Sequence, residues 1–229
     1  MHIDRRLETI ANLVPQGCVL ADIGTDHAYL PVWLLDKQRI ARAIAGDIAA
    51  GPCQAARTTV AQFGQHEHVE VRQGSGLKVL SPGEADCITI AGMGASTIIS
   101  ILEDDTEVAR SAELLVLQPM AGRWLCSHGW QLAAEELVDD APHFYEIIAA
   151  KRGLAPVYSA AECAVGPLLL AQKHPLLDKQ LERQLATCRQ LLENMGRSER
   201  ARASEKYKEI EALKAELEVL QNGKRSDSK

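Results

Sequence analysis

Residues with acidic, imidazole and phenol side chains cluster in one short segment near the start of the chain. Asp22, Asp26, His27 and Tyr29 lie within eight positions and directly follow the apolar run 18–21. The pattern predicts a buried strand that ends in a tight turn before a helix begins. In open α/β sheets ligands bind beyond the carboxyl ends of the strands, so a nucleotide-like cofactor is expected at this turn.

Asp47 is a second acidic residue at the end of a predicted strand. It closes the apolar segment 41–48 and lies roughly 20 residues beyond Gly24, a spacing at which an acid accepts hydrogen bonds from ribose hydroxyls. Taken alone, Gly24 is compatible with an ordinary turn and Asp47 with a helix N-cap. The combination at this spacing favours ribose binding.

The glycine content of the turn restricts the kind of cofactor. Dinucleotide-binding folds use three glycines in the pattern G-x-G-x-x-G to bring the backbone close to a pyrophosphate. This turn has Gly24 alone, and the carboxylate of Asp26 would repel a second anion. A ligand with ribose, adenine and a positive centre fits better. We therefore expect S-adenosylmethionine, whose sulfonium and ammonium groups are compatible with Asp22 and Asp26 nearby.

Two further strand ends carry candidate ligand-binding residues. The fourth predicted strand runs into the segment 91–94, where two glycines let backbone groups approach a flat group. Amino-directed adenine or cytosine methyltransferases carry a carboxamide or carboxylate and an aromatic ring there, and this segment has neither. The fifth strand ends at Gln118 and Pro119, which places an amide at the same rim. The alternatives are a glycine C-cap or tight turn for the segment 91–94, and a plain strand-end position for Gln118.

Composition limits the classes to which the chain can belong. It has 229 residues, of which 46% are hydrophobic and 24% charged, which suits one core domain plus an appendage. The six cysteines never approach a Cys-x-x-Cys spacing, so we expect free thiols, no disulfide framework and no metal. No charged-then-apolar leader opens the chain, and no apolar stretch reaches the ~20 residues that span a bilayer. We expect a soluble cytoplasmic protein with no membrane contact; the oligomeric state is left open and is compatible with a monomer.

Hydrophobic periodicity predicts strands that alternate with helices through the first two thirds of the chain. Such alternation implies an α/β fold with a mostly parallel sheet. The last two predicted strands have no room for a helix between them, which forces them to pair antiparallel. The expectation is a class I, Rossmann-like methyltransferase sheet of seven strands with one antiparallel strand at its edge. The expected strands are 18–23, 42–48, 68–73, 85–91, 113–118, 130–138 and 144–151, after a leading helix at 3–14.

The pattern changes after about residue 165. Apolar residues recur at steps of three and four from Leu177 to Met195, and a second apolar run extends from Ala203 to Leu220. Such spacing is typical of helices that pair with one another. We expect an antiparallel, coiled-coil-like helical hairpin, followed by a disordered tail at 223–229.

The chain is therefore expected to have two domains, a cofactor-binding domain at 1–160 and the helical hairpin at 161–229. Residues 1–159 carry 12 Lys and Arg against 20 Asp and Glu, whereas residues 160–229 carry 13 against 11. The hairpin is the better candidate to contact a polyanion, although solvated helix faces often show such a balance.

Several motifs, in order along the chain, resemble one family of bacterial tRNA-modifying enzymes. DIGTDHAYLP at 22–31 and IAGMG at 90–94 are specific, and Gly76-Leu77, LQP at 117–119 and FYEII at 144–148 are individually weak. Together they cover essentially the whole chain and resemble the tRNA (adenine-22, nitrogen-1) methyltransferase family, TrmK. The resemblance implies S-adenosylmethionine-dependent methylation of nitrogen 1 of adenine 22 in the dihydrouridine arm of bacterial tRNA, with the hairpin helping to hold the tRNA.

Two departures from the family pattern concern the site. The family usually has Asp or Asn in a G-D-G-L pattern, a candidate for the adenine amino group of the cofactor, where this chain has Ser75. A hydroxyl can still accept that hydrogen bond, so the affinity is expected to fall while the chemistry survives. The loop 120–123 is a few residues shorter than in the family, which bears on how the target is positioned.

A ring-nitrogen target assigns roles to the residues of the first turn. Nitrogen 1 of adenine has a lone pair and needs no base before it attacks, so alignment is the main task. Asp26 is expected to stabilise the positive charge that develops on the purine, and His27 or Asp26 to accept the amino proton afterwards. Tyr29 is expected to stack on the extruded base. The alternatives are a turn-forming role for Asp26, a structural imidazole for His27 and a core position for Tyr29.

The predicted site therefore has three groups of residues, which overlap. The catalytic candidates are Asp26, His27 and Tyr29, and the substrate-binding candidates are Tyr29, Gly94, Gln118 and Pro119. The cofactor-binding candidates are Asp22, Gly24, Thr25, Asp26, His27, Asp47, Ile48, Ser75, Gly76, Ala91, Gly92 and Met93.

Other functions remain open from the sequence. The chain is compatible with a methyltransferase that acts on another RNA, a protein or a small molecule, and with a non-catalytic module that binds S-adenosylmethionine and uses its coiled coil for partner helices. A nicotinamide-dependent oxidoreductase is disfavoured because the turn lacks the required glycines.

Overall fold

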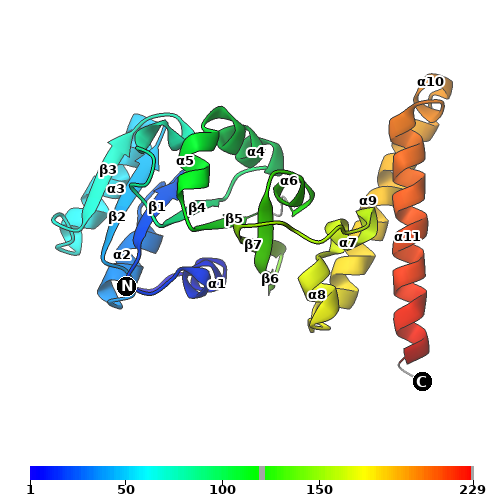
Figure 1. Cartoon of the computed structure of the whole chain (residues 1–229), viewed down its shortest axis with the longest axis horizontal. Coiled ribbons are helices and arrows are strands. Elements are labelled where there is room, and N and C mark those ends of the chain that lie inside the picture. The colour runs from blue at the N-terminus through cyan, green and yellow to red at the C-terminus, as the bar shows by residue number, and fades with distance from the viewer. Residues whose placement is uncertain (119–121, 228–229) are drawn as a thin grey trace. The chain divides into compact units, whose positions relative to one another are not determined.

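The structure of the chain is a computed structural model that describes the backbone of residues 1–118 and 122–227, without the side chains of 122–123 and 224–227 (Figure 1). The predicted substrate residue Pro119 lies outside the described residues. The chain divides into two compact units, Met1–Ala155 and Pro156–Lys229. The functional roles expected for residues 1–160 and 161–229 stay predictions.

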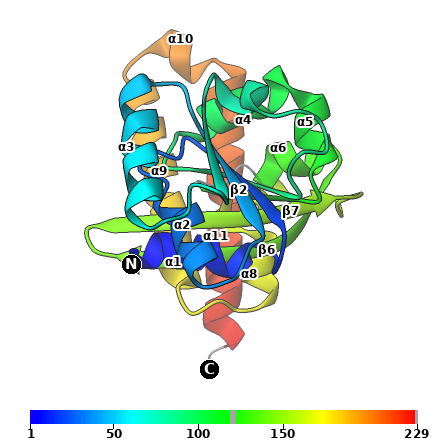
Figure 2. The same cartoon turned by 90° about the vertical axis from the view of Figure 1, so that its left-hand side faces the viewer.

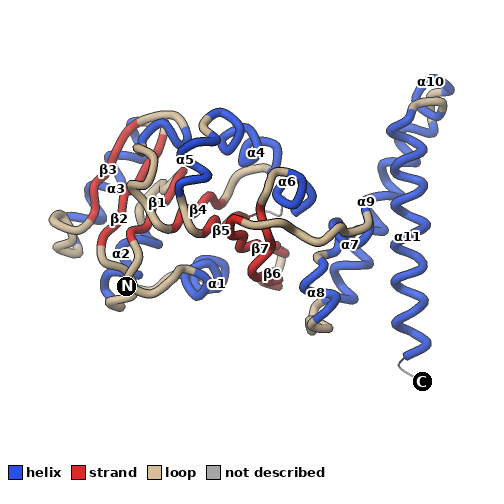
Figure 3. The backbone as a smooth tube through the Cα atoms, viewed as in Figure 1, coloured by secondary structure: helices blue, strands red, loops and turns tan. Residues whose placement is uncertain are grey.

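The first unit is built on one mixed sheet, to which the described residues contribute seven strands (Figure 3). Every strand predicted from hydrophobic periodicity is present, with ends that differ by at most two residues. The strands are β1 (Val19–Ile23), β2 (Arg42–Asp47), β3 (Val69–Gln73), β4 (Cys87–Ala91), β5 (Leu114–Gln118), β6 (Trp130–Asp140) and β7 (His143–Arg152).

The strand order is β3-β2-β1-β4-β5-β7-β6. β1 pairs in parallel with both β2 and β4, and β7 pairs antiparallel with both β5 and β6. The predicted Rossmann-like α/β class, with seven strands and the last one antiparallel, is confirmed. After β3 the chain crosses to the other side of β1, so the carboxyl ends of β1 and β4 flank the topological switch point where such sheets bind ligands.

The expected position of the antiparallel strand at the edge of the sheet is wrong. β7 lies between β5 and β6, and β6 forms the edge. Four consecutive residues of β7, 147–150, are buried, and a continuous buried run requires cover on both faces and a neighbour on both sides. β6 instead carries the partly exposed Glu136 and Asp139 and the exposed Asp140, and charged residues are typical of edge strands.

Helices cover both faces of the sheet. Successive side chains of a strand point to opposite faces, and Leu20, Ala43 and Cys87 belong to one core cluster with buried residues of α1, α2 and α3. Figure 2 shows α2 and α3 on one side of β2 and α4 and α5 on the other. The helices of this unit are α1 (Arg5–Leu13), α2 (Tyr29–Asp36), α3 (Ala50–Gln62), the short 3₁₀ helix η1 (Gly76–Val79), α4 (Ala95–Asp104), α5 (Thr106–Ser111) and α6 (Gly122–Ser127).

The described part of the second unit is helical. Two long helices lie side by side in opposite directions and are joined through a short one (Figure 1). Leu181, Leu185 and Cys188 are buried on the first, and Ile210 and Leu217 on the second. The elements are α7 (Ala160–Val165), α8 (Pro167–Ala171), α9 (Leu177–Gly196), α10 (Glu199–Arg202) and α11 (Glu205–Asp227).

The expectation of a disordered tail that begins at Gly223 is wrong for residues 223–227. α11 continues through Gly223 to Asp227, and residues 228–229 lie outside the described part. A glycine costs only about 1 kcal/mol in a helix interior, and adding residues to an existing helix is far easier than nucleating one. A single glycine therefore does not end a helix of this length.

The described residues contain neither a helix that could span a membrane nor a cluster of side chains that could hold a metal ion. Within residues 1–118 and 122–227, no helix combines the length and apolar character needed to cross a membrane. In that same part of the chain, no group of three or more His, Cys, Asp or Glu side chains is arranged to hold a metal ion.

Candidate active site

The turn after β1 is held in an uncommon backbone conformation. Gly24, Asp26 and Ala28 all have positive φ angles, of 74°, 52° and 56°, a region that glycine enters freely and aspartate more readily than most residues. The backbone amides of Gly24 and Thr25 donate to the carbonyl oxygen of Gly46 at 2.8 and 3.1 Å. The turn is therefore fastened to the end of β2, where Asp47 follows.

Asp22 is a buried carboxylate at the base of the turn. Its Oδ2 accepts a hydrogen bond of 2.7 Å from the Thr25 hydroxyl, and its Oδ1 accepts one of 2.7 Å from the Thr89 hydroxyl. Burial raises the pKa of Asp22 above its ordinary value, although the two hydroxyls and the positive charge of Arg6 act in the opposite direction. Asp22 thus holds the turn in place and puts a carboxyl group beneath it.

Asp47 links the turn to the chain that enters α3. Its Oδ1 accepts a hydrogen bond of 2.9 Å from the amide of Ala49, and its Oδ2 one of 3.3 Å from the amide of Asp26. The side chain is only half-buried, and each carboxylate oxygen can accept more than one hydrogen bond. Both the helix-entry role and ribose binding are therefore compatible with its geometry.

Two hollows lie along the carboxyl ends of the strands in the first unit. The first, of about 300 Å³, includes Asp47, Ile48, Ser75, Gly76 and Met93 in its lining and is bounded on one side by residues of α4. Ile48 is 68% exposed, which is unusual for an isoleucine and leaves an apolar surface free to contact a flat ring. Gly76 has a φ of +54°, and a β-carbon there would crowd Ile101.

The second hollow, of about 350 Å³, lies where β1 and β4 end. Its walls include Asp22, Asp26, His27 and Tyr29, and it meets the first hollow at Gly24, which lines both. The structure thus gathers all twelve predicted cofactor residues around two adjoining hollows. Their roles in binding stay predictions.

The Met93 side chain lies over Gly24, the residue that lines both hollows. The terminal methyl of its side chain lies directly over Gly24, so closely that a β-carbon on Gly24 would collide with it. Glycine is therefore required at position 24 both by the backbone angle and by the packing. A ligand that passes over Gly24 from one hollow into the other would meet the Met93 side chain.

Asp26, His27 and Tyr29 form the outer rim of the second hollow. The rings of His27 and Tyr29 are stacked, with centroids 5.1 Å apart and planes 10° from parallel. His27 Nε2 lies 3.7 Å from Asp26 Oδ1, and the Tyr29 residue is 45% exposed. A core role for Tyr29 is therefore wrong, and its outer face is available to a ligand.

Two predicted substrate residues lie elsewhere than expected. Gln118 is buried and does not line either hollow; its Oε1 instead accepts hydrogen bonds from Arg6 Nη1 at 3.0 Å and from the amide of Gly92 at 3.3 Å. Gly94 also lies outside both linings and is the residue that precedes α4. Gln118 supports the residues of the wall and is not itself exposed to the second hollow.

Arg6 is a site residue that the sequence reasoning missed. It comes from α1, before the first strand, and lines the second hollow beside Asp22 and Gly92. The motifs that mark the site follow strand ends, and a helix that precedes the sheet carries no such signal.

The fold and the site together define a class of protein. A sheet of seven strands with the last antiparallel, and acidic residues at the ends of β1 and β2 in place of a glycine triad, are the features of Rossmann-like methyltransferases. A family model described as TrmK, tRNA (adenine(22)-N(1))-methyltransferase, matches residues 20–222. The chain belongs to this family, which confirms the predicted resemblance.

Individual relatives agree with the family match. The chain is 34% identical to the tRNA (adenine(22)-N(1))-methyltransferase of Bacillus subtilis (strain 168), over 96% of each chain. The crystal structure of the B. subtilis m1A22 tRNA methyltransferase TrmK superposes with a TM-score of 0.86 at 32% identity, covering 96% of this chain and 99% of that one. A Streptococcus pneumoniae protein provisionally described as a tRNA (m1A22) methyltransferase, solved in complex with S-adenosyl-L-methionine, gives a TM-score of 0.82 at 31% identity and covers 96% and 100%.

Proposed function

We propose that this chain transfers the methyl group of S-adenosylmethionine to nitrogen 1 of adenine 22 in bacterial tRNA. The observation that carries the proposal is the pair of hollows at the switch point of the sheet, lined by the predicted cofactor residues, in a chain of the TrmK family. The relative solved with S-adenosyl-L-methionine supports the choice of cofactor.

The first hollow suits the adenosine part of the cofactor. The half-buried carboxylate of Asp47 is placed to accept hydrogen bonds from ribose hydroxyls, and the exposed Ile48 offers an apolar surface to the adenine. Ser75 lines the same hollow, and its hydroxyl is the proposed acceptor of a hydrogen bond from the adenine amino group. The remaining part of the cofactor then passes Gly24 into the second hollow, where Asp22 and Asp26 suit its positive groups.

The residues at the rim align and stabilise the reacting adenine. When bound, S-adenosylmethionine supplies an electrophilic methyl group, and the enzyme must hold the attacking nitrogen in line with it. The exposed carboxylate of Asp26 is placed to stabilise the positive charge that develops on the purine. His27, 3.7 Å from Asp26, is placed to accept the amino proton afterwards.

Tyr29 provides a stacking surface for the target base. The rings of Tyr29 and His27 already stack on one another, with centroids 5.1 Å apart, a distance that is usual for two rings in contact and leaves no room for a base between them. The base therefore stacks on the outer face of Tyr29. Because nitrogen 1 lies on the Watson–Crick edge, a paired target must first be extruded, at a cost of a few kcal/mol.

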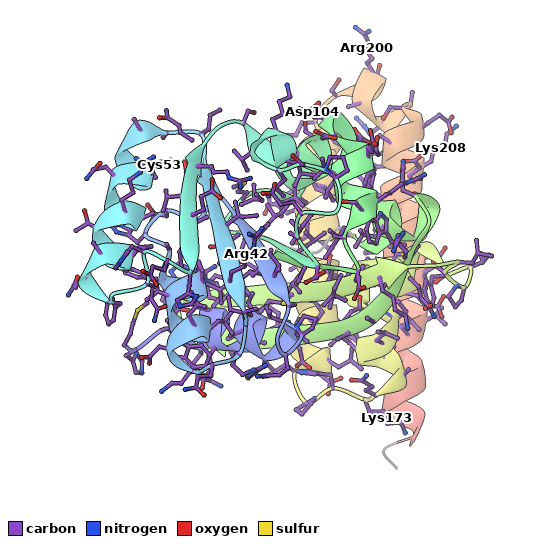
Figure 4. All side chains as sticks on the ribbon, turned by 60° about the vertical axis from the view of Figure 1, so that its left-hand side comes forward. Arg42, Cys53, Asp104, Lys173, Arg200 and Lys208 are labelled. Atoms are coloured by element: carbon purple, nitrogen blue, oxygen red, sulfur yellow. The ribbon has the colours of Figure 1, made fainter. Side chains whose placement is uncertain are left out.

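The hairpin offers a positively charged surface for the tRNA backbone. Its connecting end carries five exposed cationic side chains against two acidic ones over residues 197–208, and Figure 4 labels Arg200 and Lys208 there. Arg197 and Lys208 pair with acidic neighbours on the hairpin, while Arg200 and Arg202 extend from α10. We call residues 197–208 the basic tip, and phosphate contacts there would make binding strongly salt-dependent.

Transfer of a labelled methyl group to tRNA tests the function. Purified protein is expected to label bacterial tRNA, and a transcript in which adenine 22 is replaced by guanine is expected to take up no label. Label on the guanine variant would refute the position, and label on a protein or small molecule without RNA would refute the substrate class. Binding of the cofactor without any transfer would favour the non-catalytic alternative. Asp26→Asn is expected to lower the rate by on the order of 10²- to 10⁴-fold.

A charge-reversal pair tests the role of the basic tip. Arg200→Glu with Arg202→Glu is expected to raise the KM for tRNA and to leave the cofactor affinity unchanged. The matched control, Lys173→Glu with Lys179→Glu, makes the same change in charge at the other end of α9. An equal effect of both pairs would show that general electrostatics, and not the tip, attracts the RNA.

The localisation completes the proposal. The six cysteines are free, which fits a reducing cytoplasm, and we infer a cytoplasmic protein. Fractionation of cells would check this statement.

A further inference from the structure

The hairpin formed by β6 and β7 extends past the edge of the sheet that carries the candidate site. The last pair between β5 and β7 is Leu117 with Ile148, whereas β6 and β7 stay paired as far as Asp140 and His143. β5 runs parallel to β4, so its carboxyl end belongs to the edge at which such sheets bind ligands. The end of the hairpin, residues 138–145, therefore rises beyond that edge.

One face of the hairpin end is directed at α1. Successive side chains of a strand alternate between its faces, so His143, Tyr145 and Ile147 lie on the same face of β7. Ile147 belongs to the core cluster that contains buried residues of α1, and Tyr145 packs against that cluster. Arg5 Nη1 donates to the carbonyl oxygen of Asp139 at 3.3 Å. α1 and the hairpin end thus form one continuous surface.

Three flat side chains form a row across this surface, beginning at the second hollow. Arg6 lines the hollow, and its guanidinium carbon lies 5.7 Å from the centre of the Tyr145 ring. The centres of the Tyr145 and His143 rings are also 5.7 Å apart, with planes 32° from parallel. Tyr145 is half-buried, whereas His143 is exposed. His143 is therefore the exposed end of the row and lies no more than two such steps from a wall of the hollow.

We propose that the His143 ring stacks on the base of a nucleotide directly next to the target adenine in the tRNA. The inference rests on the proposed function, which puts the target adenine at the rim of the second hollow. Proteins bind unpaired RNA bases by stacking them on aromatic side chains, histidine included. Extrusion of the target removes its stacking contact with the neighbouring bases, and His143 replaces part of that contact.

The charges around His143 favour a base over a phosphate. Asp140 is paired with His143 in the hairpin, and Asp4 Oδ2 lies 3.9 Å from Arg6 Nε. Both carboxylates would repel a phosphodiester, so the surface has little to offer the RNA backbone. A base carries no charge and has a face that an aromatic ring can stack on.

Methyl transfer to three full-length tRNAs tests the assignment. One is the unaltered tRNA, and each of the other two lacks the base of one of the nucleotides that flank adenine 22. With the unaltered tRNA, His143→Ala is expected to lower kcat/KM by at least about 5-fold, the lower end of what one stacked base contributes. With the tRNA that lacks the stacked base, the same variant is expected to lose less than about 2-fold, because the partner of the ring is already missing.

Two further variants separate stacking from other roles of the side chain. His143→Phe keeps an aromatic ring and is expected to stay within about 2-fold of the unaltered protein. The matched control is His66→Ala, which removes an exposed histidine before β3, at the opposite edge of the sheet, and is expected to change nothing with any of the three tRNAs. The affinity for S-adenosylhomocysteine in calorimetry is expected to be the same in all variants, because His143 lies outside the linings of both hollows.

Three results would overturn the proposal and leave the proposed function standing. Unchanged kcat/KM in His143→Ala would show that the ring does not contact the RNA. An equal loss with all three tRNAs would show that His143 supports the surface without contacting either flanking base. A loss that His143→Phe shares would assign the contact to the imidazole nitrogens. Absence of transfer to tRNA by the unaltered protein would instead refute the proposed function, and this inference with it.

Discussion

The Thr89 hydroxyl donates a hydrogen bond of 2.7 Å to Oδ1 of Asp22, joining β4 to β1 beneath the candidate site. Both side chains are buried, so the carboxylate depends on this donor and on the Thr25 hydroxyl in place of water. This hydrogen bond makes the stability of the sheet depend on the protonation state of Asp22.

Thr89→Val removes the hydroxyl and keeps the shape of the side chain. The change leaves a buried carboxylate oxygen with one donor fewer and is expected to lower the free energy of unfolding by about 1–3 kcal/mol. Thr59→Val is the matched control, because its buried hydroxyl donates only to the carbonyl oxygen of Ala55 within α3. The control is expected to cost less than about 1 kcal/mol.

The effect of Thr89→Val is expected to depend on pH. Burial raises the pKa of Asp22 above its ordinary value of 3.8, so the stability that Asp22 contributes is greatest below pH 3.8 and falls as the pH rises through the raised pKa. The lost hydrogen bond had favoured the ionised form, so the variant should be more destabilised at pH 8 than at pH 4. Denaturant unfolding at the two pH values measures this, and a cost that is the same at both would contradict it.

Gly24→Ala is expected to lower the affinity for S-adenosylhomocysteine by more than 10-fold. The added carbon meets the Met93 side chain and forces that residue towards the space shared by the two hollows. Gly17→Ala is the matched control, because Gly17 has a similar φ of +76° but open space around the added carbon. Both variants should lose about 1–2 kcal/mol of stability from the backbone angle, and only the first should lose binding in calorimetry.

Glu84 is expected to make the protein sensitive to acid. Bidentate hydrogen bonds from Arg72, at 2.6 and 2.8 Å, and the amide of Ser81 lower the pKa of Glu84 from 4.5 to about 2. A lowered pKa means that the contribution is present above pH 4.5 and is lost as the pH falls towards 2. Glu84→Gln should cost about 2 kcal/mol at pH 7 and progressively less below pH 4.5.

Thermal unfolding followed by circular dichroism between pH 2.5 and 7 checks the role of Glu84. Glu67→Gln removes an exposed carboxylate near the same edge of the sheet and serves as the control. If the two variants lost stability in parallel over the whole range, the Arg72–Glu84 pair would not be the source of the acid sensitivity.

Tyr29→Ala is expected to lower kcat/KM for tRNA by about 5- to 100-fold, the usual contribution of one base stacked on an aromatic ring. Tyr29→Phe keeps the ring and should stay within a few-fold of the unaltered enzyme. The affinity for S-adenosylhomocysteine should not change in either variant. A large loss in Tyr29→Phe would assign the function to the hydroxyl and contradict the stacking role.

The sequence predicts most of the sheet because its signals are local. The apolar run before Asp22 and the polar residues after it mark both a strand and its end, and the same holds for Asp47. The order of β6 and β7 was not predictable in this way, because it depends on which strand buries more of its surface against β5. The burial of residues 147–150 shows that β7 is the inner strand only once the neighbouring strands are known.

The candidate site was predictable only where its residues follow strands. Arg6 belongs to a helix that precedes the sheet, and its hydrogen bond to Gln118 is a long-range contact with no local pattern. Gln118 was correctly predicted to end the fifth strand, but its side chain bonds to Arg6 and Gly92 and does not line the second hollow. The direction of a side chain at a strand end depends on which donors surround it. The position of Met93 over Gly24 likewise arises from packing between two loops.

Because the Met93 methyl group lies over Gly24, where the two hollows meet, the candidate site is expected to distinguish ligands by their length. A ligand confined to one hollow is expected to leave Met93 in place, whereas a ligand that passes over Gly24 into both hollows is expected to move the Met93 side chain. The flexible thioether moves with little resistance, so entry is not blocked. Selectivity between ligands is then expected to come from binding in both hollows at once, which a ligand that fills only one hollow does not achieve.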